Sequence, residues 1–503
     1  MSGQTIFQLF EEAARRNEGA AALVLGDRQV TYARLTEDIA LAARRLMREE
    51  AGSGPVIIMT DDPLSALTSF FAAAAVGRPA LPLDPAMPAA TVALVESLAA
   101  TDAGLRKKPP HPALRAALSR EGRGLKAEVA ASLPSPPAGE GSRRRRVGEG
   151  AFAANSEYAS DAEFYWGLTS GTTGDPKLFA RSHASWVASF EAAEKIFDFP
   201  PRSKILVPGP LHHSLFLYGA VHALCRGHTV VLPGQFRPSR IAGAARQATH
   251  LYAVPFMLAE MLKARVEAPA LQAIFSGGAK LPCVLRRECE ERWPDADLVE
   301  FYGASETSFV TFHSTRNPAS DGSVGRPFPG VSIEICGENG EALQQDGTGR
   351  IFVKSPMLFA RYVGDAPAQA WFSAGDTGYI DAAGCLHLTG RTNRMIKSKG
   401  LKIHPEAIEA ALLALPQVRR AAVVDLPDAA RGAVAVAAIE FAGGMALPRK
   451  SLAAHCRQML GLSHCPRSYF AADRLPLTRS GKIAVAEVRK ALTEGGTSYR
   501  EIT

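Results

Sequence analysis

Short apolar runs rich in β-branched residues recur along most of this chain, with helical patterns between them. The clearest runs are Val56-Ile57-Ile58-Met59, Ile205-Leu206-Val207, Thr229-Val230-Val231-Leu232 and Ala273-Ile274-Phe275. Uncharged runs of this length are typical of buried strands. Because strands that alternate with helices favour parallel sheets covered by helices, the pattern predicts an α/β fold.

The pattern changes near residue 390. A basic turn, Gly390-Arg391-Thr392-Asn393-Arg394, precedes a helical stretch and two strand candidates, Val423-Val424 and Val434-Ala435-Val436. A chain of 503 residues can hold several units of about 150 residues each. We therefore expect a large N-terminal domain of parallel and mixed sheets flanked by helices, residues 1–392, and a small mobile α+β C-terminal domain, residues 393–503.

Residues 101–150 interrupt the N-terminal domain with prolines, glycines and like charges, which together do not build a core. Eleven basic and three acidic residues lie between 106 and 146, a net charge of +8, whereas the whole chain carries +7. The rest of the chain is therefore close to neutral. We interpret 101–150 as a low-complexity basic insertion on the surface. A basic arm for an anionic partner is the alternative.

Targeting signals and cysteine spacing predict the cellular setting. The seven cysteines are scattered without a Cys-x-x-Cys pair, which favours reduced thiols over disulfides or structural zinc. Glu11 and Glu12 interrupt the only candidate signal peptide, and the apolar run at 70–76 is far shorter than the roughly 20 residues of a membrane helix. We expect a soluble cytoplasmic protein with no membrane span.

A predicted strand that holds Phe164, Tyr165 and Trp166 precedes the stretch Leu168-Thr169-Ser170-Gly171-Thr172-Thr173-Gly174-Asp175-Pro176-Lys177. A loop this dense in Gly, Ser and Thr can aim backbone N–H groups and hydroxyls at phosphate oxygens, and Lys177 adds a positive charge. It is not a P-loop, because the spacing Gly-x-x-x-x-Gly-Lys-Ser/Thr is absent. The loop indicates a phosphate-containing ligand.

This loop resembles the phosphate loop of the adenylate-forming enzymes, a superfamily of acyl-CoA synthetases, adenylation domains and firefly-type luciferases. Further segments are similar to that family's other motifs, in its order: Phe301-Tyr302-Gly303-Ala304-Ser305-Glu306-Thr307, Ser373-Ala374-Gly375-Asp376-Thr377-Gly378, Gly390-Arg391 with Lys397-Ser398-Lys399-Gly400, and Pro476-Leu477-Thr478-Arg479-Ser480-Gly481-Lys482. The likeness covers nearly the whole chain except about 101–150. Within the family it resembles the bacterial fatty acyl-CoA synthetases most.

The resemblance implies a site for ATP. Its phosphates would meet a group of small and basic residues: Ser170, Gly171, Thr172, Thr173, Gly174 and Lys177. The neighbouring Thr169 is expected among the catalytic residues. Its base would lie between the close-approach wall Ser276-Gly277-Gly278-Ala279 and the stacking ring of Tyr302, and Gly303 and Thr307 are also expected to bind the nucleotide. Asp376 would accept hydrogen bonds from the ribose hydroxyls, with Arg391 assisting.

Joining a carboxylate to the α-phosphate of ATP brings two anions together, and like charges at about 4 Å repel by roughly 1–4 kcal/mol. Cations must offset this repulsion as charge builds up in the transition state. The resemblance assigns that role to Lys482, the Mg²⁺ ligand to Glu306 and a place near the carboxylate to His213. In a second domain orientation the loop from Lys397 to Gly400 would serve the thiol step.

Asn393 departs from the family's usual aspartate or lysine at the hinge. Asn tolerates unusual backbone angles, so rotation there is still expected. Between Phe199 and Ala259 the chain has no Asp or Glu. Amino-acid-activating relatives usually carry an aspartate after the histidine, so its absence favours an apolar acyl or aryl tail.

The first hypothesis is therefore an ATP-dependent acyl-CoA synthetase that uses ATP, Mg²⁺ and CoA to activate an apolar acid, a fatty acid above all. An acyl-AMP ligase that loads a carrier protein and an aryl-acid CoA ligase are the alternatives. A catalytically silent nucleotide-binding protein is disfavoured by Glu306, Asp376 and Lys482. Nucleic-acid binding through the basic insertion is the weakest alternative, and we expect no such partner.

Overall fold

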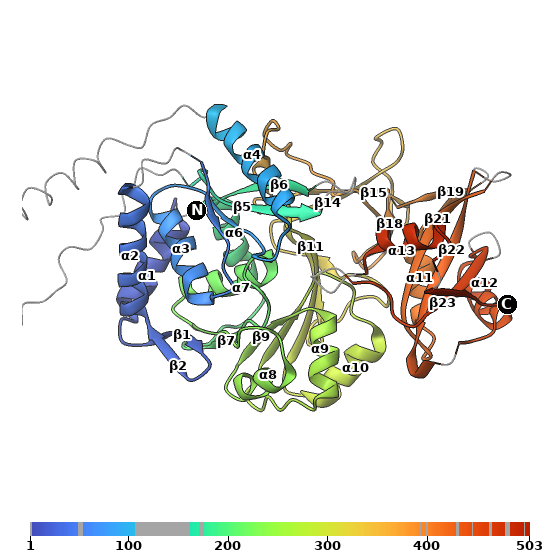
Figure 1. Cartoon of the computed structure of the whole chain (residues 1–503), viewed down its shortest axis with the longest axis horizontal. Coiled ribbons are helices and arrows are strands. Elements are labelled where there is room, and N and C mark those ends of the chain that lie inside the picture. The colour runs from blue at the N-terminus through green and yellow to red at the C-terminus, as the bar shows by residue number, and fades with distance from the viewer. Residues whose placement is uncertain are drawn as a thin grey trace, which may run out of the picture.

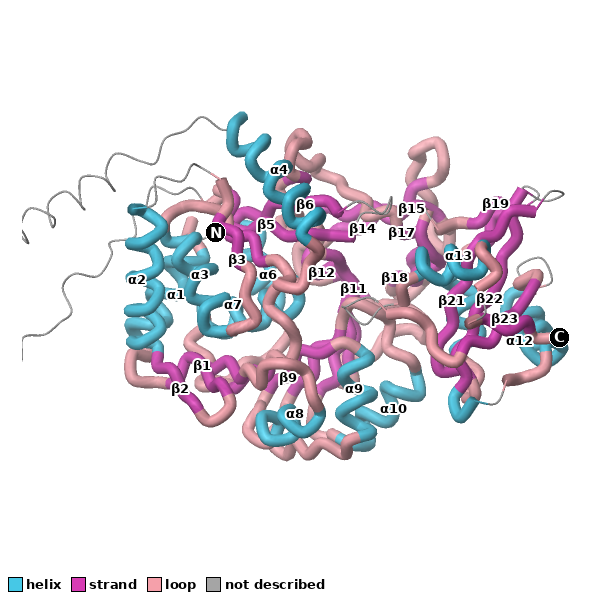
Figure 2. Tube along the Cα trace, in the orientation of Figure 1, coloured by secondary structure: helices cyan, strands magenta, loops and turns pink. Residues whose placement is uncertain are grey.

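The computed structural model describes residues 3–48, 54–105, 160–170, 176–392, 394–398, 401–428, 432–444, 446–461, 465–477, 483–496 and 498–503. The described chain forms a large body and a smaller C-terminal part, which lies at the right of Figure 1 and is coloured orange to red. Both parts contain sheets and helices (Figure 2), so the predicted α/β class is confirmed.

The largest sheet of the described residues has nine strands: β1 (Ala21–Leu25), β2 (Arg28–Thr31), β7 (Lys204–Leu206), β8 (Thr229–Val231), β9 (His250–Ala253), β10 (Ala273–Ser276), β11 (Asp297–Ala304), β12 (Ser308–Ser314) and β13 (Arg326–Pro327). Their order is β13-β12-β11-β10-β9-β7-β8-β1-β2. The strands from β11 through β1 pair in parallel, and antiparallel strands close both edges. Three of the predicted runs are β7, β8 and β10.

Helices separate these strands: α1 (Ile6–Arg16), α2 (Tyr32–Arg48), α7 (Ser214–Cys225), α8 (Pro238–Ala245), α9 (Pro255–Lys263) and α10 (Cys283–Arg292). Helix α7 packs on β7, β8 and β9, and α1 packs on α7. The Thr5 side chain starts α1 with a capping box that it shares with Gln8. Phe10 then packs against Phe71, with the ring centroids 4.5 Å apart.

A second sheet of the described chain has five strands: β3 (Val56–Ile58), β4 (Ala80–Pro82), β5 (Glu163–Ser170), β6 (Pro176–Ser182) and β16 (Arg361–Tyr362). Its order is β16-β6-β5-β4-β3, with β3, β4 and β5 parallel and the others antiparallel. The helices of the described residues that accompany it are α3 (Pro63–Ala75), α4 (Ala89–Leu105) and α6 (His183–Glu194). The predicted strand at 56–59 is β3.

A third sheet of the large body has four described strands: β14 (Ser332–Cys336), β15 (Gly349–Lys354), β17 (Asp376–Ile380) and β18 (Leu386–Arg391). In the C-terminal part, the described residues then form a hairpin, three helices, a short 3₁₀ turn and a four-stranded sheet. These elements are β19 (Ile396–Ser398), β20 (Leu401–Ile403), α11 (Pro405–Leu413), β21 (Val418–Asp428), β22 (Gly432–Phe441), η1 (Ala442–Gly444), α12 (Arg449–Leu460), β23 (Ser468–Ala472), α13 (Val485–Thr493) and β24 (Tyr499–Glu501). Ile408, Ala437, Ile439 and Leu452 form the centre of a separate core there.

Arg361 joins the two ends of the chain that flank residues 106–159. Its guanidinium donates two hydrogen bonds to Asp102 near the end of α4, at 2.9 and 2.7 Å, and one to Glu163 at the start of β5, at 2.9 Å. Arg361 and Asp102 are buried. The first residues of the predicted insertion, 101–105, belong to helix α4, and Asp102 among them is held by this ion pair. The rest of the insertion lies outside the described residues.

All seven cysteines are free thiols. None of the helices in the described ranges has the length and apolar character needed to cross a bilayer.

Candidate active site

The predicted phosphate loop connects two antiparallel strands. Thr169 of β5 lies opposite Lys177 of β6, and Ser170 lies opposite Pro176. The prediction that a strand precedes the loop is confirmed, and the element after it is a strand. Of the predicted phosphate contacts, Gly171, Thr172, Thr173, Gly174 and the side chain of Ser170 lie outside the described residues.

Lys177, Tyr362 and Glu306 come together from three separate elements. The Lys177 ammonium lies 5.4 Å from the centroid of the Tyr362 ring. The Tyr362 hydroxyl donates a hydrogen bond to Glu306 Oε1 at 3.0 Å. Burial, and then the Glu306 carboxylate, raise the pKa of the Tyr362 phenol. The structure thus connects Lys177 to Glu306 through a tyrosine that was not among the predicted site residues.

The turn that carries Glu306 is fastened by Arg181, a fully buried residue of β6. The guanidinium donates to the carbonyl of Ser305 at 2.8 Å, to the hydroxyl of Ser308 at 2.7 Å and to the carbonyl of Met357 at 2.7 Å. Burial lowers the pKa of Arg181 to about 10, which leaves it charged at neutral pH. Sequence reasoning missed this residue, although a lone arginine after Leu178-Phe179-Ala180 was a usable signal.

Thr307 belongs to the framework of the same turn. Its buried hydroxyl accepts a hydrogen bond from the backbone N–H of Ala304 at 2.9 Å. Gly303 of β11 lies opposite Phe309 across the hairpin, and a Cβ on it would lie 1.8 Å from the Ser308 carbonyl oxygen. These two residues shape the turn and thereby fix the backbone of Glu306.

The predicted adenine wall follows β10, next to the end of β11. Ser276 and Glu300 are neighbours in this parallel pair, so the loop at 277–279 and Tyr302 lie at the same carboxyl edge of the sheet. A Cβ on Gly277 would lie 2.6 Å from the Phe301 ring, and Gly278 has φ +82°. Only glycine allows this close approach and this backbone angle without strain.

Glu300 anchors the loop that contains Gly277, Gly278 and Ala279. The buried carboxylate accepts hydrogen bonds from the Leu281 amide at 2.9 Å and from Arg286 at 3.0 Å, and it pairs with His313 at 3.3 Å. Burial alone would raise the pKa of Glu300, but the His313, Leu281 and Arg286 contacts outweigh it and lower the pKa.

The stability that Glu300 contributes should be lost at acid pH. Because its folded-state pKa lies below the unfolded value of about 4.3, the contribution is complete above that pH and declines as the pH falls through the folded pKa. Glu300→Gln should lower the free energy of unfolding by about 1.5–3 kcal/mol at neutral pH. Urea unfolding should also show a shallower decline for this variant between about pH 5 and about pH 3. Glu334→Gln, at an exposed position, is the control; an equally steep decline in Glu300→Gln would contradict the assignment.

Tyr302, Asp376 and Arg391 form a hydrogen-bonded group. The Tyr302 hydroxyl donates to Asp376 Oδ2 at 2.7 Å, and Arg391 Nε donates to Asp376 Oδ1 at 2.7 Å. The register of β17 and β18 places Asp376 opposite Arg391. Burial, and then Asp376, raise the pKa of Tyr302; burial alone would lower the pKa of Arg391, but Asp376 outweighs it and raises it. Sequence reasoning assigned these three residues to one nucleotide, and the structure brings them into contact.

His213 is the residue that precedes α7, at the N-cap of the helix. The hydroxyl of the next residue, Ser214, lies 3.0 Å from the Tyr165 hydroxyl and 3.1 Å from the Ser305 hydroxyl. Because Ser305 precedes Glu306, this chain of hydroxyls links the start of α7 to the Glu306 turn. The structure thus places the predicted carboxylate region beside the predicted metal region.

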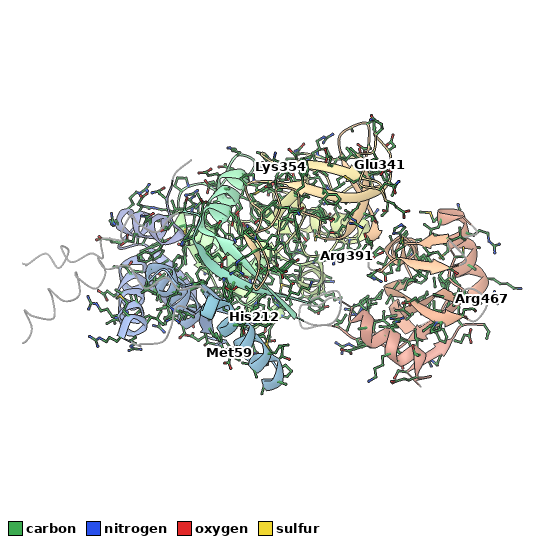
Figure 3. All side chains as sticks on the ribbon, turned by 90° about the horizontal axis from the view of Figure 1, so that it is seen from above. Met59, His212, Glu341, Lys354, Arg391 and Arg467 are labelled. Atoms are coloured by element: carbon green, nitrogen blue, oxygen red, sulfur yellow. The ribbon has the colours of Figure 1, made fainter. Side chains whose placement is uncertain are left out.

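The chain passes from the large body to the C-terminal part next to Arg391, which lies between the two in Figure 3. The Thr392 amide donates to the Gly375 carbonyl at 2.8 Å, on the side of the large body. Arg394 instead contacts the C-terminal part, with hydrogen bonds to Glu409 at 2.7 Å and to the Val423 carbonyl at 3.1 Å. The change of partners takes place across Asn393, which lies outside the described residues.

The remaining predicted residues lie in less complete segments. Lys397 belongs to β19, although its side chain is not described, and Gly400 lies outside the described residues. Lys482 also lies outside them, next to Ile483. A β-bridge between Leu477 and Ile483 joins the two sides of the loop that contains this lysine.

The donor set fits a magnesium nucleotide. Mg²⁺ prefers carboxylate oxygens and usually binds through one or two carboxylates plus substrate phosphates. Glu306 offers Oε2, since Oε1 accepts from Tyr362, and Asp376 offers acceptors suited to ribose hydroxyls. Across the described ranges, no group of three or more His, Cys, Asp and Glu residues could hold a metal ion.

Comparison with known proteins gives two family matches. A family described as AMP-binding enzyme matches residues 10–363, and one described as AMP-binding enzyme C-terminal domain matches residues 407–482. Among curated relatives, an uncharacterized acyl-CoA ligase of Bacillus subtilis (strain 168), YhfT, is 36% identical over 503 residues and aligns over 97% of this chain and 99% of its own. VraA of Staphylococcus haemolyticus, which carries the name of a long chain fatty acid-CoA ligase, is 33% identical over 334 residues, 65% of this chain and 70% of its own.

Solved structures match the whole described architecture. The amide bond synthetase McbA from Marinactinospora thermotolerans has a TM-score of 0.78 at 25% identity and covers 97% of this chain and 100% of its own. The o-succinylbenzoate CoA synthetase MenE from Bacillus subtilis, in complex with its acyl-adenylate intermediate, has a TM-score of 0.77 at 23% identity, with coverage of 97% and 99%. At 23% identity, the likeness to MenE shows a shared fold and nothing more.

Proposed function

The chain belongs to the AMP-binding enzyme family and is an AMP-forming ligase, and from this premise we propose that it joins an apolar carboxylic acid, a fatty acid above all, to CoA. The acid carboxylate would attack the α-phosphorus of ATP, giving acyl-AMP and pyrophosphate. The CoA thiol would then attack the acyl carbon, giving the thioester and AMP. One observation carries the proposal: the carboxyl end of β11 presents Tyr302, bonded to Asp376, and Glu306, bonded to Tyr362.

In the adenylation step the residues of this chain hold the nucleotide and offset its charge. Asp376 and Arg391 would bind the ribose, and Lys177 would attract phosphate oxygens. Mg²⁺, when bound at Glu306, would neutralise part of the phosphate charge. Lys482 would approach from the C-terminal part and stabilise the charge that develops at the α-phosphate. His213 and Thr169 would lie beside the reacting carboxylate and phosphate.

The thiol step would need a second arrangement of the two domains, 1–392 and 393–503. Their separate cores and the change of partners around residue 393 support a hinge there. Rotation would withdraw Lys482 and bring the segment from Lys397 to Gly400 toward the acyl-adenylate.

We expect Asp376→Asn to weaken nucleotide binding. The substitution replaces a charged acceptor for the ribose hydroxyls, and hydrogen bonds to charged groups contribute about 1.5–3 kcal/mol each. The dissociation constant for AMP, measured by titration calorimetry, should rise about 10- to 100-fold. Asp365→Asn, at an exposed position, should leave it unchanged. Equal affinities in all three proteins would remove Asp376 from the site.

An apolar acid is supported by the surroundings of α7, the helix that follows His213. Its residue Tyr218 is buried, and its hydroxyl donates to the Ser189 carbonyl at 3.1 Å, so it offers little to a charged substrate group. The long chain fatty acid name of VraA points to an aliphatic tail.

An aryl acid is the second candidate, favoured by the aromatic rings around α7. Tyr218 lies edge-on to Phe309 at 5.1 Å and to Phe190 at 5.3 Å, with Trp186 at 5.6 Å. Aromatic side chains pack well on an aromatic ring in such geometries. An aryl tail could make the same kind of edge-on contact with a neighbouring ring.

ATP–pyrophosphate exchange with a panel of fatty and aryl acids tests the proposal. We expect exchange that depends on the acid, and the preferred acid decides between the two candidates. A comparison of two thiol acceptors, free CoA and a phosphopantetheine-bearing carrier protein, then separates the synthetase from a carrier-loading ligase. Absence of exchange with every acid would reject adenylate formation.

A further inference from the structure

We propose that Tyr362 is a positioning residue for adenylation, which holds the Glu306 carboxylate for the divalent cation and seats the Lys177 ammonium beside it. The proposal rests on the proposed function, since it assigns a part of that nucleotide site. It adds a residue from β16, a strand that carries none of the predicted site residues.

Two contacts on one side chain support this role. The Tyr362 hydroxyl donates to Glu306 Oε1 at 3.0 Å, so that oxygen is engaged and Oε2 is left for a cation. A carboxylate bonded through one oxygen loses much of its rotational freedom, which favours a single orientation of the other. The Lys177 ammonium lies 5.4 Å from the centroid of the Tyr362 ring, within the range of a cation–π attraction.

The fold fixes Tyr362 from several directions. In the sheet, Tyr362 pairs with Phe179 of β6, and the Val363 amide donates to the Leu178 carbonyl at 2.9 Å. Its ring packs edge-on against Phe359, with centroids 4.9 Å apart. The preceding residue is Arg361, whose side chain is held by Asp102 and Glu163.

The turn that carries Glu306, the hydrogen-bond partner of Tyr362, is fixed as well. The backbone carbonyl of Glu306 accepts a hydrogen bond from the Phe359 amide at 2.7 Å, which ties the turn to the segment that leads into β16. Arg181 fastens the same turn through the Ser305 carbonyl. Tyr362 therefore joins two elements that are each held by independent contacts, and it does so at the point where two cations would meet the phosphates.

Tyr362→Phe removes the hydroxyl and keeps the ring, so it separates the two contacts. The Mg²⁺ concentration that half-saturates ATP binding, measured by titration calorimetry without any acid, should rise about tenfold. Affinity for AMP in EDTA should stay at the wild-type value, because that ligand does not use the carboxylate. Tyr379→Phe is the matched control, since Tyr379 lies in β17 with its ring stacked on His387.

Tyr362→Leu also removes the ring. Compared with Tyr362→Phe, it should raise the dissociation constant for metal-free ATP about threefold, because the cation–π contact with Lys177 is lost. An unchanged metal-free affinity in this variant would remove the seating of Lys177 from the proposal.

A double mutant separates positioning from general destabilisation. In a Glu306→Gln background, Tyr362→Phe should change the half-saturating Mg²⁺ concentration less than about twofold, because the carboxylate it positions is gone. A full tenfold effect there, or a wild-type Mg²⁺ dependence in Tyr362→Phe alone, would overturn the inference. Failure of the wild type to exchange pyrophosphate with any acid would instead overturn the proposed function, so the two failures are distinguishable.

Discussion

Lys482→Ala should reduce the rate of ATP–pyrophosphate exchange by about 10²- to 10³-fold, the usual loss when one donor to a developing anion is removed. The lysine would offset the charge that forms when two anions are joined, and the proposed site offers Lys177 and Mg²⁺ at other places on the nucleotide. Thioester formation from supplied acyl-AMP should stay near the wild-type rate, because Lys482 would be withdrawn in that step.

The control for this prediction is Lys490→Ala, an exposed lysine of α13 in the same C-terminal part. It removes the same charge from the same domain and should leave both half-reactions unchanged. Equal losses in both half-reactions of Lys482→Ala would mean that the lysine acts on folding or on domain docking. Full exchange activity would exclude it from the chemistry.

Arg361→Met should lower the free energy of unfolding of the large body by about 3–5 kcal/mol, because it leaves the carboxylates of Asp102 and Glu163 without their buried partner. Methionine has a similar length and no charge, so the loss comes from uncompensated carboxylates and little from lost packing. Urea unfolding followed by tryptophan fluorescence measures it directly, since the buried Trp166 donates to Glu163 at 2.8 Å.

Two controls separate this mechanism from a general effect of losing an arginine. Arg500→Met breaks a 2.7 Å pair with Asp473 in which both side chains are mostly exposed, 71% and 90%, and should cost less than about 1 kcal/mol. The triple variant Arg361→Met, Asp102→Asn, Glu163→Gln should recover part of the lost stability. No difference between Arg361→Met and Arg500→Met would contradict the buried ion-pair account.

Local sequence patterns were sufficient for several buried strands and for the fold class. The runs at 56–59, 205–207, 229–232 and 273–275 became β3, β7, β8 and β10, because uncharged β-branched segments of that length have few alternatives to a buried strand.

Contacts between distant segments could not be read in the same way. Arg361 meets Asp102 across 259 residues and Glu163 across 198, and no local pattern marks such a pair. The local sequence does not predict Tyr362 as a site residue, because its role depends on where β16 joins β6. The contact of Asp102, in the last turns of α4, with Arg361 is equally invisible in the local sequence.

The family motifs indicated a part of the site that neither local sequence patterns nor the described contacts give alone. They grouped Tyr302, Asp376 and Arg391 before any contact was known, and the sheet register then brought the three together. They also named Lys482, Gly400 and the phosphate-loop glycines, which lie outside the described residues. The roles of these residues stay predictions.

The most direct test of the central claim is to identify the products of one reaction by mass spectrometry. Purified full-length protein would be given ATP, Mg²⁺, CoA and the acid preferred in the exchange assay. We predict AMP and the acyl-CoA thioester in equal amounts, both absent without the acid. Formation of ADP in place of AMP, or AMP without any thioester while CoA is present, would contradict the account.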